Sequence, residues 1–358
     1  MQALVLVGGE GTRLRPLTYD IPKPMLPVVG SPMIGRVVEW LARYGIERVV
    51  FSLGYRADAF ADFLGGEWAG VALDYAVEPE ALDTAGAVLY GATEGDLLDE
   101  RFIVVNGDVL TDLALDELIA FHVRHGGDAT ISLTPVEDPS AYGVVPTDGA
   151  GRVLAFIEKP PRDEAPTNLI NAGTYVLEPA VIKRIAPGRR VSIEREVFPA
   201  LVADEQLYAL ASDAYWLDTG TPERYLKAQL DVLSGARPLV SLPEHERSGS
   251  VLLGAGAQCI GAELRGPVFL CAGARVGAGA TIDTAILGEH VEVGPGARVV
   301  GSAVLGGATI EEGAIVEHSI IGPGAVVGAG AHVHSLSVLG ARASVPAGAV
   351  LDSARLPV

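Results

Sequence analysis

The chain has 358 residues and 49% of them are hydrophobic, which predicts about two folded domains and excludes a disordered protein. Its formal net charge of −19 argues against nucleic-acid binding, which needs a basic face, although a few local cations could still hold an anionic nucleotide. The sequence contains no run of about 18 apolar residues, so no membrane span is expected. The two cysteines, Cys259 and Cys271, are too few for a disulfide framework, so we expect buried free thiols and a cytoplasmic location.

The first 234 or so residues alternate short β-like runs with helical segments. Strands are predicted at residues 3–7, 48–53, 71–77 and 102–105, and helices at 116–125, after Ser31-Pro32 and after Thr221-Pro222. Gly45 is the expected end of the helix that Ser31 opens, and Gly126 is the expected end of the helix at 116–125. The β-α-β order predicts an α/β fold with a Rossmann-like sheet covered on both faces. Four later runs, 130–136, 143–146, 153–157 and 172–177, lack long helices between them and predict a mixed-sheet insertion that walls a site.

Residues 233–250 are rich in proline, glycine and charge and predict a linker, after which the periodicity changes. Aliphatic residues recur at about every sixth position: Leu264, Leu270, Val276, Ile282, Leu287, Val293, Val299, Leu305, Ile310, Val316, Ile321, Val327, Val333, Leu339 and Val345. Six residues per side and three sides per coil give a parallel β-helix of five or six coils, and the pattern resembles the hexapeptide repeats of left-handed β-helices. The boundaries we expect are an α/β domain at 1–235, a linker at 236–249 and a left-handed β-helix at 250–358.

A glycine-rich segment follows the first predicted strand directly. Gly8, Gly9 and Gly11 permit positive φ angles and a close approach of the backbone to a ligand, and successive N–H groups in such a turn can hold phosphate oxygens. The spacing fits neither the dinucleotide-binding nor the P-loop pattern. Arg13 and Lys23, within the next dozen or so residues, strengthen the case for a phosphate-binding loop.

Two lysines and two aspartates stand in settings that suit phosphate chemistry. Prolines flank Lys23 and follow Lys159, and proline restricts the local backbone and so aims the side chain. Asp108 follows the predicted strand 102–105, and Asp218 stands before a capped helix. Mg²⁺ that bridges phosphates prefers one or two such carboxylates. Each aspartate taken alone could equally be a turn or cap residue.

Residues 6–18, Leu-Val-Gly-Gly-Glu-Gly-Thr-Arg-Leu-Arg-Pro-Leu-Thr, together with Pro22-Lys23-Pro24, resemble the signature of sugar-nucleotide pyrophosphorylases. Further segments of that family recur in order at residues 106–108, 142–145, 156–160, 171–175 and 216–220, so the resemblance covers nearly the whole chain and includes the hexapeptide tail. Residues 84–86 and 192–199 are similar to the mannose-1-phosphate guanylyltransferase branch.

The resemblance implies a role for each matching position. It assigns the nucleoside triphosphate to Leu6, Gly8, Gly9, Gly11, Thr12, Arg13, Lys23, Glu80, Asp83, Thr84, Asn106 and Asp108. It assigns the sugar 1-phosphate to Gly143, Glu158, Lys159, Asn171 and Gly173. Asp108 and Asp218 would hold Mg²⁺, and with Arg13, Lys23 and Lys159 they would form the catalytic set.

One position departs from the family pattern, because Asp83 stands where relatives often have glycine next to the base. Glu80 and Asp83 could accept hydrogen bonds from a guanine edge, so we expect GTP and mannose 1-phosphate to give GDP-mannose. The alternative within the class is a glucose-1-phosphate enzyme that uses UTP, dTTP or ATP.

Two functions from other classes remain open from the sequence. One is a hexapeptide acyltransferase that uses a histidine of the tail, with His290, His318, His332 and His334 available. The other is a regulatory partner that has lost the chemistry. The flat coils of the tail also predict a homo-oligomer.

Overall fold

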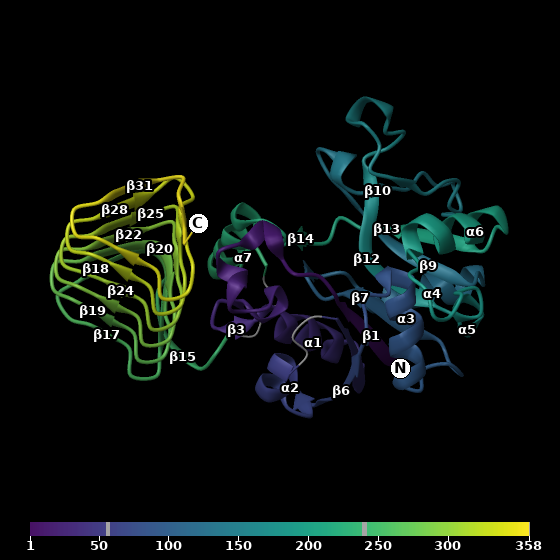
Figure 1. Cartoon of the computed structure of the whole chain (residues 1–358), viewed down its shortest axis with the longest axis horizontal. Coiled ribbons are helices and arrows are strands. Elements are labelled where there is room, and N and C mark those ends of the chain that lie inside the picture. Colours follow the sequence, from purple (N-terminus) through teal and green to yellow (C-terminus); the bar gives the residue numbers. More distant parts are fainter. Residues whose placement is uncertain (55–57, 238–241, 358) are drawn as a thin grey trace. The chain divides into compact units, whose positions relative to one another are not determined.

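The computed structural model describes residues 1–54, 58–237 and 242–357 and divides into two compact units (Figure 1). The first unit contains Met1–Gly9 and Val37–Trp216, and the second contains Glu10–Arg36 and Leu217–Val358. The segment that follows the first two glycines therefore belongs to the same compact unit as the C-terminal half of the chain. The sequence-based domain boundaries at residues 235 and 249 stay a prediction, and residues 238–241 of the expected linker lie outside the described residues.

A parallel sheet forms the centre of the first unit, in the order β7-β1-β4-β6. Its strands are β1 (Gln2–Val7), β4 (Arg48–Leu53), β6 (Val71–Val77) and β7 (Phe102–Asn106), with the short β5 (Glu67–Trp68) at the edge. Strand β1 is apolar because it is covered on both faces, and Ala3, Leu4 and Val5 are fully buried. The four strands predicted for this sheet are confirmed.

The sheet continues into the predicted mixed region. Strand β12 (Leu169–Leu177) runs antiparallel to β7, to β9 (Ala129–Pro135) and to β10 (Gly143–Val144). Strand β11 (Ile157–Glu158) pairs with β10, and β13 (Leu207–Ala211) pairs with β9. The prediction of a strand at 153–157 is wrong for most of that run, because Val153 makes only an isolated bridge and β11 begins at Ile157.

The α-helices that lie wholly within the described part of the first unit are α2 (Asp58–Leu64), α3 (Asp83–Glu94), α4 (Leu115–His125), α5 (Pro179–Ile182) and α6 (Phe198–Ala203). Helix α3 packs on β1, β4 and β6, and α4 packs on β9, β12 and β13. Gly126 ends α4 in the left-handed conformation, as predicted.

Two predicted helix starts have different outcomes. Thr221 caps α7 (Pro222–Ser234) by accepting a hydrogen bond from the Arg224 N–H, as predicted. Ser31 does not cap α1 (Met33–Arg43), because Ser31–Pro32 is extended as β3 and pairs with β2 (Pro27–Val28). Pairing with a neighbouring strand thus replaces the local capping signal. The predicted end of α1 is confirmed, because Gly45, two residues after Arg43, has a φ of +73° and its N–H donates to the Ala42 carbonyl at 3.1 Å.

The C-terminal part of the second unit is a parallel β-helix (Figure 1). One face is the six-stranded sheet β17 (Gln258–Cys259), β19 (Arg275–Val276), β21 (Glu292–Val293), β24 (Thr309–Ile310), β27 (Val326–Val327) and β30 (Ser344–Val345). A second face contains β22 (Arg298–Val300), β25 (Ile315–Glu317), β28 (His332–His334) and β31 (Val350–Asp352), and a third contains β23 (Ala303–Val304), β26 (Ile320–Ile321), β29 (Val338–Leu339) and β32 (Arg355–Leu356). The longer strands β18 (Glu263–Leu270) and β20 (Thr281–Leu287) each contribute to both the second and the third face, and on the third face β18 pairs with the earlier strand β16.

The register explains the sixfold periodicity. Val276 lies beside Val293, and Val327 lies beside Val345, so one coil takes 17 or 18 residues. The repeated aliphatic residues fill the interior, with one correction, since Val304 and not Leu305 belongs to the core cluster. Glycine follows many of these residues because the next coil is close: a Cβ on Gly294 would lie 2.7 Å from the backbone nitrogen of Glu312.

Three smaller expectations can be compared with the structure. Part of the predicted linker is a strand, β15 (His245–Ser248), which pairs with β16 (Val251–Gly254) of the β-helix. Both cysteines are free, but only Cys271 is fully buried, and burial raises the pKa of its thiol to about 12. Cys259 is partly exposed, because it lies in the first strand of its sheet. Among the described residues, no helix is long and apolar enough to cross a membrane.

Candidate active site

The glycine-rich loop turns sharply where it enters the second unit. Gly11 has a φ of +61° and precedes a short 3-10 helix, Thr12–Leu14. Its carbonyl accepts a hydrogen bond from the Thr18 hydroxyl at 2.8 Å. A Cβ on Gly11 would lie 3.0 Å from the Lys23 Cβ and 3.1 Å from the Thr18 Cγ2. Glycine is therefore required here for its conformation and for the close packing that places Arg13 and Lys23 on one short segment.

The Asp218 carboxylate is a meeting point for cations in the same unit. Lys23 Nζ lies 3.7 Å from its Oδ1, and Arg224 Nη1 lies 3.2 Å from its Oδ2. The Gly220 N–H donates to Oδ1 at 2.8 Å. The side chains of Lys23 and Asp218 are only 8% and 15% exposed, so each charge depends on partners of this kind. Arg224 was missed by sequence reasoning, although its place in the first turn of the capped helix after Asp218 could have indicated it.

Arg13 lies against Gly220, two residues after Asp218. A Cβ on Gly220 would be 2.5 Å from the Arg13 Nη2 and 2.9 Å from Asp218 Oδ1, so the guanidinium group rests directly over the glycine. The structure thus brings together three predicted catalytic residues, Arg13, Lys23 and Asp218, and adds Arg224 to them. Three cationic groups gathered at one place suit a polyphosphate.

The first unit holds the strand ends that were predicted to contact the nucleotide. Gly8 and Gly9 follow β1, and Gly9 has a φ of +106°. The Gly107 N–H donates to the Leu6 carbonyl at 2.9 Å, which fixes the turn that carries Asp108 at the carboxyl end of β7. The carboxyl ends of parallel strands are the usual ligand-binding edge of such a sheet.

Three predicted residues, Asn106, Asn171 and Gly173, form a contiguous group on β7 and β12. Gly173 has a φ of +77° and lies at an irregularity in β12, where a Cβ would be 2.6 Å from the Asn106 Nδ2. The Asn171 side chain accepts from the Gly173 N–H at 3.1 Å and donates to the Tyr175 hydroxyl at 2.9 Å. Burial raises the pKa of Tyr175, so its phenol stays neutral and holds Asn171 in place.

A second group lies on β10 and β11. Gly143 pairs with Glu158, and a Cβ on Gly143 would be 3.2 Å from the Glu158 Oε2. Lys159 follows in the left-handed conformation, with a φ of +52°, and its N–H donates to the Tyr142 carbonyl at 2.9 Å. Its ammonium group lies 3.4 Å from Glu158 Oε1. All five predicted sugar-phosphate residues therefore stand on the linked strands β10, β11 and β12 or directly after them.

The segment expected next to the base begins α3. Asp83 has a φ of +62°, a conformation that favours glycine and that aspartate tolerates better than most residues. This accounts for the glycine that relatives often have there. Thr84 donates to Glu194 Oε2 at 2.7 Å and accepts from the Ile193 N–H at 2.8 Å, which ties α3 to the segment 192–197. Glu80 and Asp83 are exposed, while the hydroxyl of Thr84 is engaged within the protein.

Within the described residues, no group of three or more His, Cys, Asp or Glu side chains could hold a metal ion. Asp108 belongs to the first unit and Asp218 to the second, so a metal shared by the two stays a prediction. A metal ion that also binds phosphates needs only one or two protein carboxylates, and Asp218, whose carboxylate also faces Lys23 and Arg224, stays a predicted ligand.

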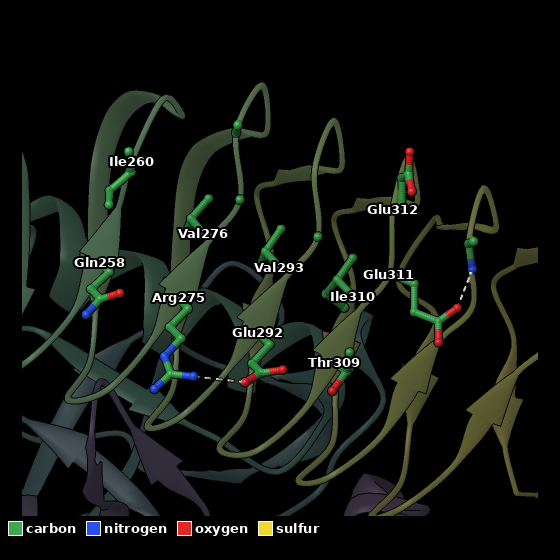
Figure 2. A pocket seen from close by; sticks show the side chains of 14 residues that line it. Gln258, Ile260, Arg275, Val276, Glu292, Val293, Thr309, Ile310, Glu311 and Glu312 are labelled. Atoms are coloured by element: carbon green, nitrogen blue, oxygen red, sulfur yellow. Dashed lines mark hydrogen bonds and ion pairs between the residues drawn. The ribbon is translucent and has the colours of Figure 1, made fainter.

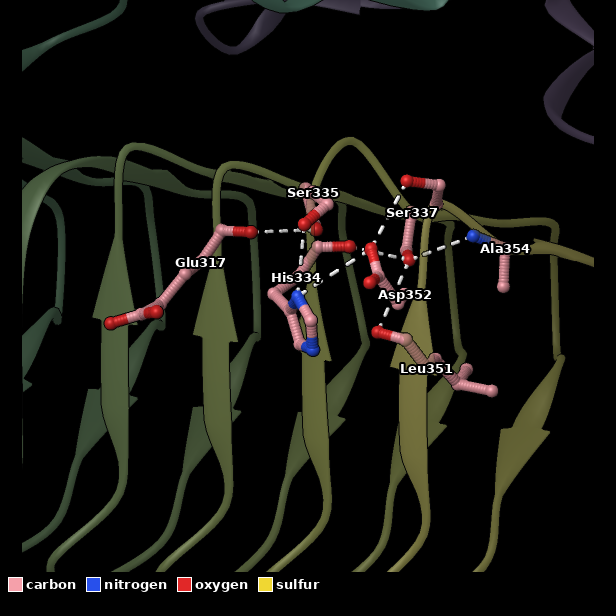
Figure 3. Close-up of polar contacts among 9 residues, drawn as sticks. Glu317, His334, Ser335, Ser337, Leu351, Asp352 and Ala354 are labelled. Atoms are coloured by element: carbon pink, nitrogen blue, oxygen red, sulfur yellow. Dashed lines mark hydrogen bonds and ion pairs between the residues drawn. The ribbon is translucent and has the colours of Figure 1, made fainter.

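The tail histidines stand at the surface of the β-helix. His290 and His318 occupy corners with positive φ angles, and His332 is exposed on β28. His334 is partly exposed, and its Nδ1 lies 2.9 Å from the Ser335 hydroxyl and 3.7 Å from Asp352 (Figure 3). These positions agree with turn and surface roles.

Three features together define a nucleotidyltransferase. They are the parallel sheet, the glycine-rich loop that is followed by Arg13 and Lys23, and the hexapeptide β-helix. The family model for nucleotidyl transferases matches residues 2–235, and the model for the GMPPB C-terminal domain matches residues 264–357. The chain belongs to the nucleotidyl transferase family.

Relatives come from several kingdoms. The mannose-1-phosphate guanylyltransferase of Mycobacterium tuberculosis is 42% identical over 299 residues, which is 83% of this chain and 82% of that protein. The probable mannose-1-phosphate guanylyltransferase 1 of rice, Oryza sativa, is 37% identical over 334 residues, which is 86% of this chain and 91% of that protein.

Solved structures are similar over the catalytic part. HddC from Yersinia pseudotuberculosis, crystallised with GMP-PN, is 31% identical, covers 64% of this chain and 99% of its own, and has a TM-score of 0.55. A putative glucose-1-phosphate thymidylyltransferase from Bacillus anthracis is 25% identical, covers 64% of this chain and 94% of its own, and has a TM-score of 0.57.

The close contact at Gly220 gives a first prediction. The Gly220→Ala substitution should move the Arg13 guanidinium and lower kcat by about tenfold or more, because small misplacements of a charge-stabilising group are costly. The unfolding temperature should stay nearly constant, since the displaced atoms are the ends of flexible side chains. Gly149→Ala is the matched control, because a Cβ there meets nothing within 4 Å. Equal kcat values for the two variants would contradict the placement of Arg13.

Proposed function

We propose that the protein transfers the guanylyl group of GTP to mannose 1-phosphate and releases GDP-mannose and pyrophosphate. The observation that carries the proposal is the cluster of Arg13, Lys23 and Arg224 around Asp218 in a chain whose relatives are named mannose-1-phosphate guanylyltransferases. The cluster provides a binding place for a polyphosphate, and the names of the relatives supply the base and the sugar.

The reaction is an in-line attack by the phosphate oxygen of the sugar 1-phosphate on the α-phosphorus of GTP, and pyrophosphate leaves. The nucleophile is ionised at neutral pH, so no general base is needed. The task of the protein is to hold two polyanions against their repulsion and to stabilise the charge that develops in the transition state. We assign the β- and γ-phosphates and the leaving pyrophosphate to Arg13 and the phosphates at the reacting centre to Lys23. We assign the phosphate of the sugar to Lys159.

The other assignments follow the groups formed in the first unit. We propose that Gly143, Glu158, Asn171 and Gly173 bind the sugar, and that Leu6, Asn106 and the loop from Gly8 to Thr12 bind the nucleotide. The hydrogen bonds that hold Asn171 rigid support this proposal. Enzymes of this family generally use a divalent metal. We propose Mg²⁺ held by Asp108 and Asp218, and when bound it would neutralise phosphate charge.

The test of function is a pyrophosphate-release panel that crosses GTP, ATP, UTP and dTTP with mannose 1-phosphate and glucose 1-phosphate. We expect the highest kcat/KM with GTP and mannose 1-phosphate. The Arg13→Ala variant should lose on the order of 10²- to 10³-fold in kcat because it removes charge stabilisation from the transition state. Preference for dTTP or UTP with glucose 1-phosphate would replace the assignment by the thymidylyl- or uridylyltransferase alternative. Absence of pyrophosphate release with every pair would support a regulatory partner.

Asp83 is the proposed determinant of the base. In the Asp83→Asn variant the side chain still tolerates the left-handed backbone but loses its negative charge, so KM for GTP should rise about tenfold while KM for ATP changes less. Glu94→Gln is the control, because Glu94 is an exposed acid at the far end of the same helix. An unchanged GTP-to-ATP preference in Asp83→Asn would exclude Asp83 from base recognition.

We also propose that the protein forms a homo-oligomer through the six-stranded face of the β-helix. A groove of about 810 Å³ runs along this face. Figure 2 shows its lining residues, with Arg275 on β19 and with Glu311 and Glu312 two coils further on. Ile260, at the end of the groove, is 80% exposed. A twofold axis through the intermediate coil would place Arg275 of one copy opposite Glu311 and Glu312 of the other, and bury Ile260.

The oligomer can be tested by light scattering after size exclusion. Arg275→Glu should lower the assembled fraction, and the double variant Arg275→Glu with Glu312→Arg should restore it, because an isologous contact exchanges both charges together. Arg298→Glu, on another face of the β-helix, is the control. A monomeric wild-type protein, or equal assembly of all variants, would contradict the proposed interface.

The two free thiols fit a reducing compartment, and we propose the cytoplasm as the location.

A further inference from the structure

The last coil of the β-helix touches the turn that follows the glycine-rich loop, and both belong to the second unit. Gly340, directly after β29, approaches Pro16 so closely that a Cβ on Gly340 would lie 3.0 Å from the Pro16 Cβ and 3.1 Å from the Pro16 carbonyl oxygen. Arg342 Nη2 forms an ion pair with Asp20 Oδ2 at 3.0 Å. The contact between coil and turn is therefore both a tight packing contact and a polar one.

Arg355 reaches the backbone of Arg13 itself. Its Nη1 donates to the carbonyl oxygen of Arg13 at 3.3 Å and to that of Arg15 at 3.4 Å. An arginine Nη carries two hydrogens, so this one nitrogen can donate to both carbonyl oxygens. A charged donor strengthens such contacts relative to a neutral one. Arg355 thereby links the carbonyl of Arg13, within the short 3-10 helix Thr12–Leu14, to that of Arg15, directly after the helix.

The chain around Arg355 is fixed by hydrogen bonds within the β-helix (Figure 3). The Ala354 N–H donates to the Ser337 hydroxyl at 3.0 Å, and that hydroxyl donates to the His334 carbonyl at 2.7 Å. Ser337 is fully buried. Arg355 itself lies in β32 beside Val338 of β29. The backbone that carries the Arg355 side chain is therefore held in place by the β-helix.

We propose that Arg355 is a positioning residue for Arg13, so that the last coil of the β-helix contributes to the transfer reaction. The Arg13 guanidinium rests on Gly220. Arg355 holds the backbone carbonyl of Arg13, and the position of this backbone determines where the Arg13 side chain begins. A shift of the Arg13 backbone would move the guanidinium away from the phosphates it is assigned to. This inference rests on the role proposed for Arg13.

The test is a double-mutant cycle on pyrophosphate release. Arg355→Ala should lower kcat by about tenfold, with KM changed less than twofold, because misplacement of a transition-state group affects kcat. In an Arg13→Ala background the same substitution should have no further effect, since the group it positions is gone. Arg355→Lys, which keeps a charged donor, should recover part of the rate. Additive losses in the cycle, or an unchanged kcat in Arg355→Ala, would overturn the proposal.

Arg298→Ala is the matched control, because Arg298 is an exposed arginine whose ion pair with Glu317, at 3.1 Å, lies within the β-helix. It should keep the wild-type kcat, and an equal loss in both variants would show a general effect on the β-helix and overturn the proposal.

Hydrogen exchange gives a readout that does not depend on activity. Amides of residues 11–20 should exchange faster in Arg355→Ala than in Arg298→Ala, and equal protection would overturn the positioning role even if the wild-type protein released no pyrophosphate. Absence of release by the wild-type protein would instead count against the proposed function.

Discussion

The carboxylate of Asp218 holds together the charged part of the second unit. Lys23 is almost fully buried, and a buried ammonium group without a counter-charge would destabilise the fold. Asp218 supplies that counter-charge, pairs with Arg224 as well, and is itself oriented by the Gly220 N–H. The same glycine leaves room for the Arg13 guanidinium. One carboxylate thus organises three cations that would otherwise repel one another. Groups that are already in place need little reorganisation during a reaction, which supports the proposal that a polyphosphate binds at this cluster.

The β-helix follows from a different constraint, which is the spacing between coils. With 17 or 18 residues per coil, every aliphatic residue on one face stacks on its counterpart in the next coil, as Val293 does on Val276. Glycine after these residues lets the adjacent backbones approach, as at Gly294. The interior is therefore continuous and rigid. A rigid stack can carry a side chain at its end with little loss of position, and this is the physical basis on which Arg355 can act on the backbone of Arg13.

Much of this architecture could be predicted from local sequence patterns. Continuous apolar runs identified the buried parallel strands, and the sixfold aliphatic repeat identified the β-helix, because both patterns follow directly from which side chains are buried. The capping of α7 by Thr221 was equally local. The failures came where distant segments decide the outcome. Ser31 has the chemistry of a helix cap, but pairing with β2 makes it extended. Part of the expected linker became β15 because the first strand of the β-helix offered free hydrogen-bonding groups along its edge.

The site shows the same division between local and distant information. Gly11, Arg13, Lys23 and Asp218 were identified from motifs, and the structure explains why they occur together. Arg224 and Arg355 belong to no motif used for the sequence, and they contribute only because folding brings them to Asp218 and to the Arg13 carbonyl. Asp83 is intermediate: the sequence shows a departure from glycine, and only the positive φ shows what glycine does there. An acidic side chain at a position that prefers glycine has a conformational cost, and the hydrogen bond that the Asp83 carboxylate accepts from the Thr84 N–H at 2.8 Å offsets part of it.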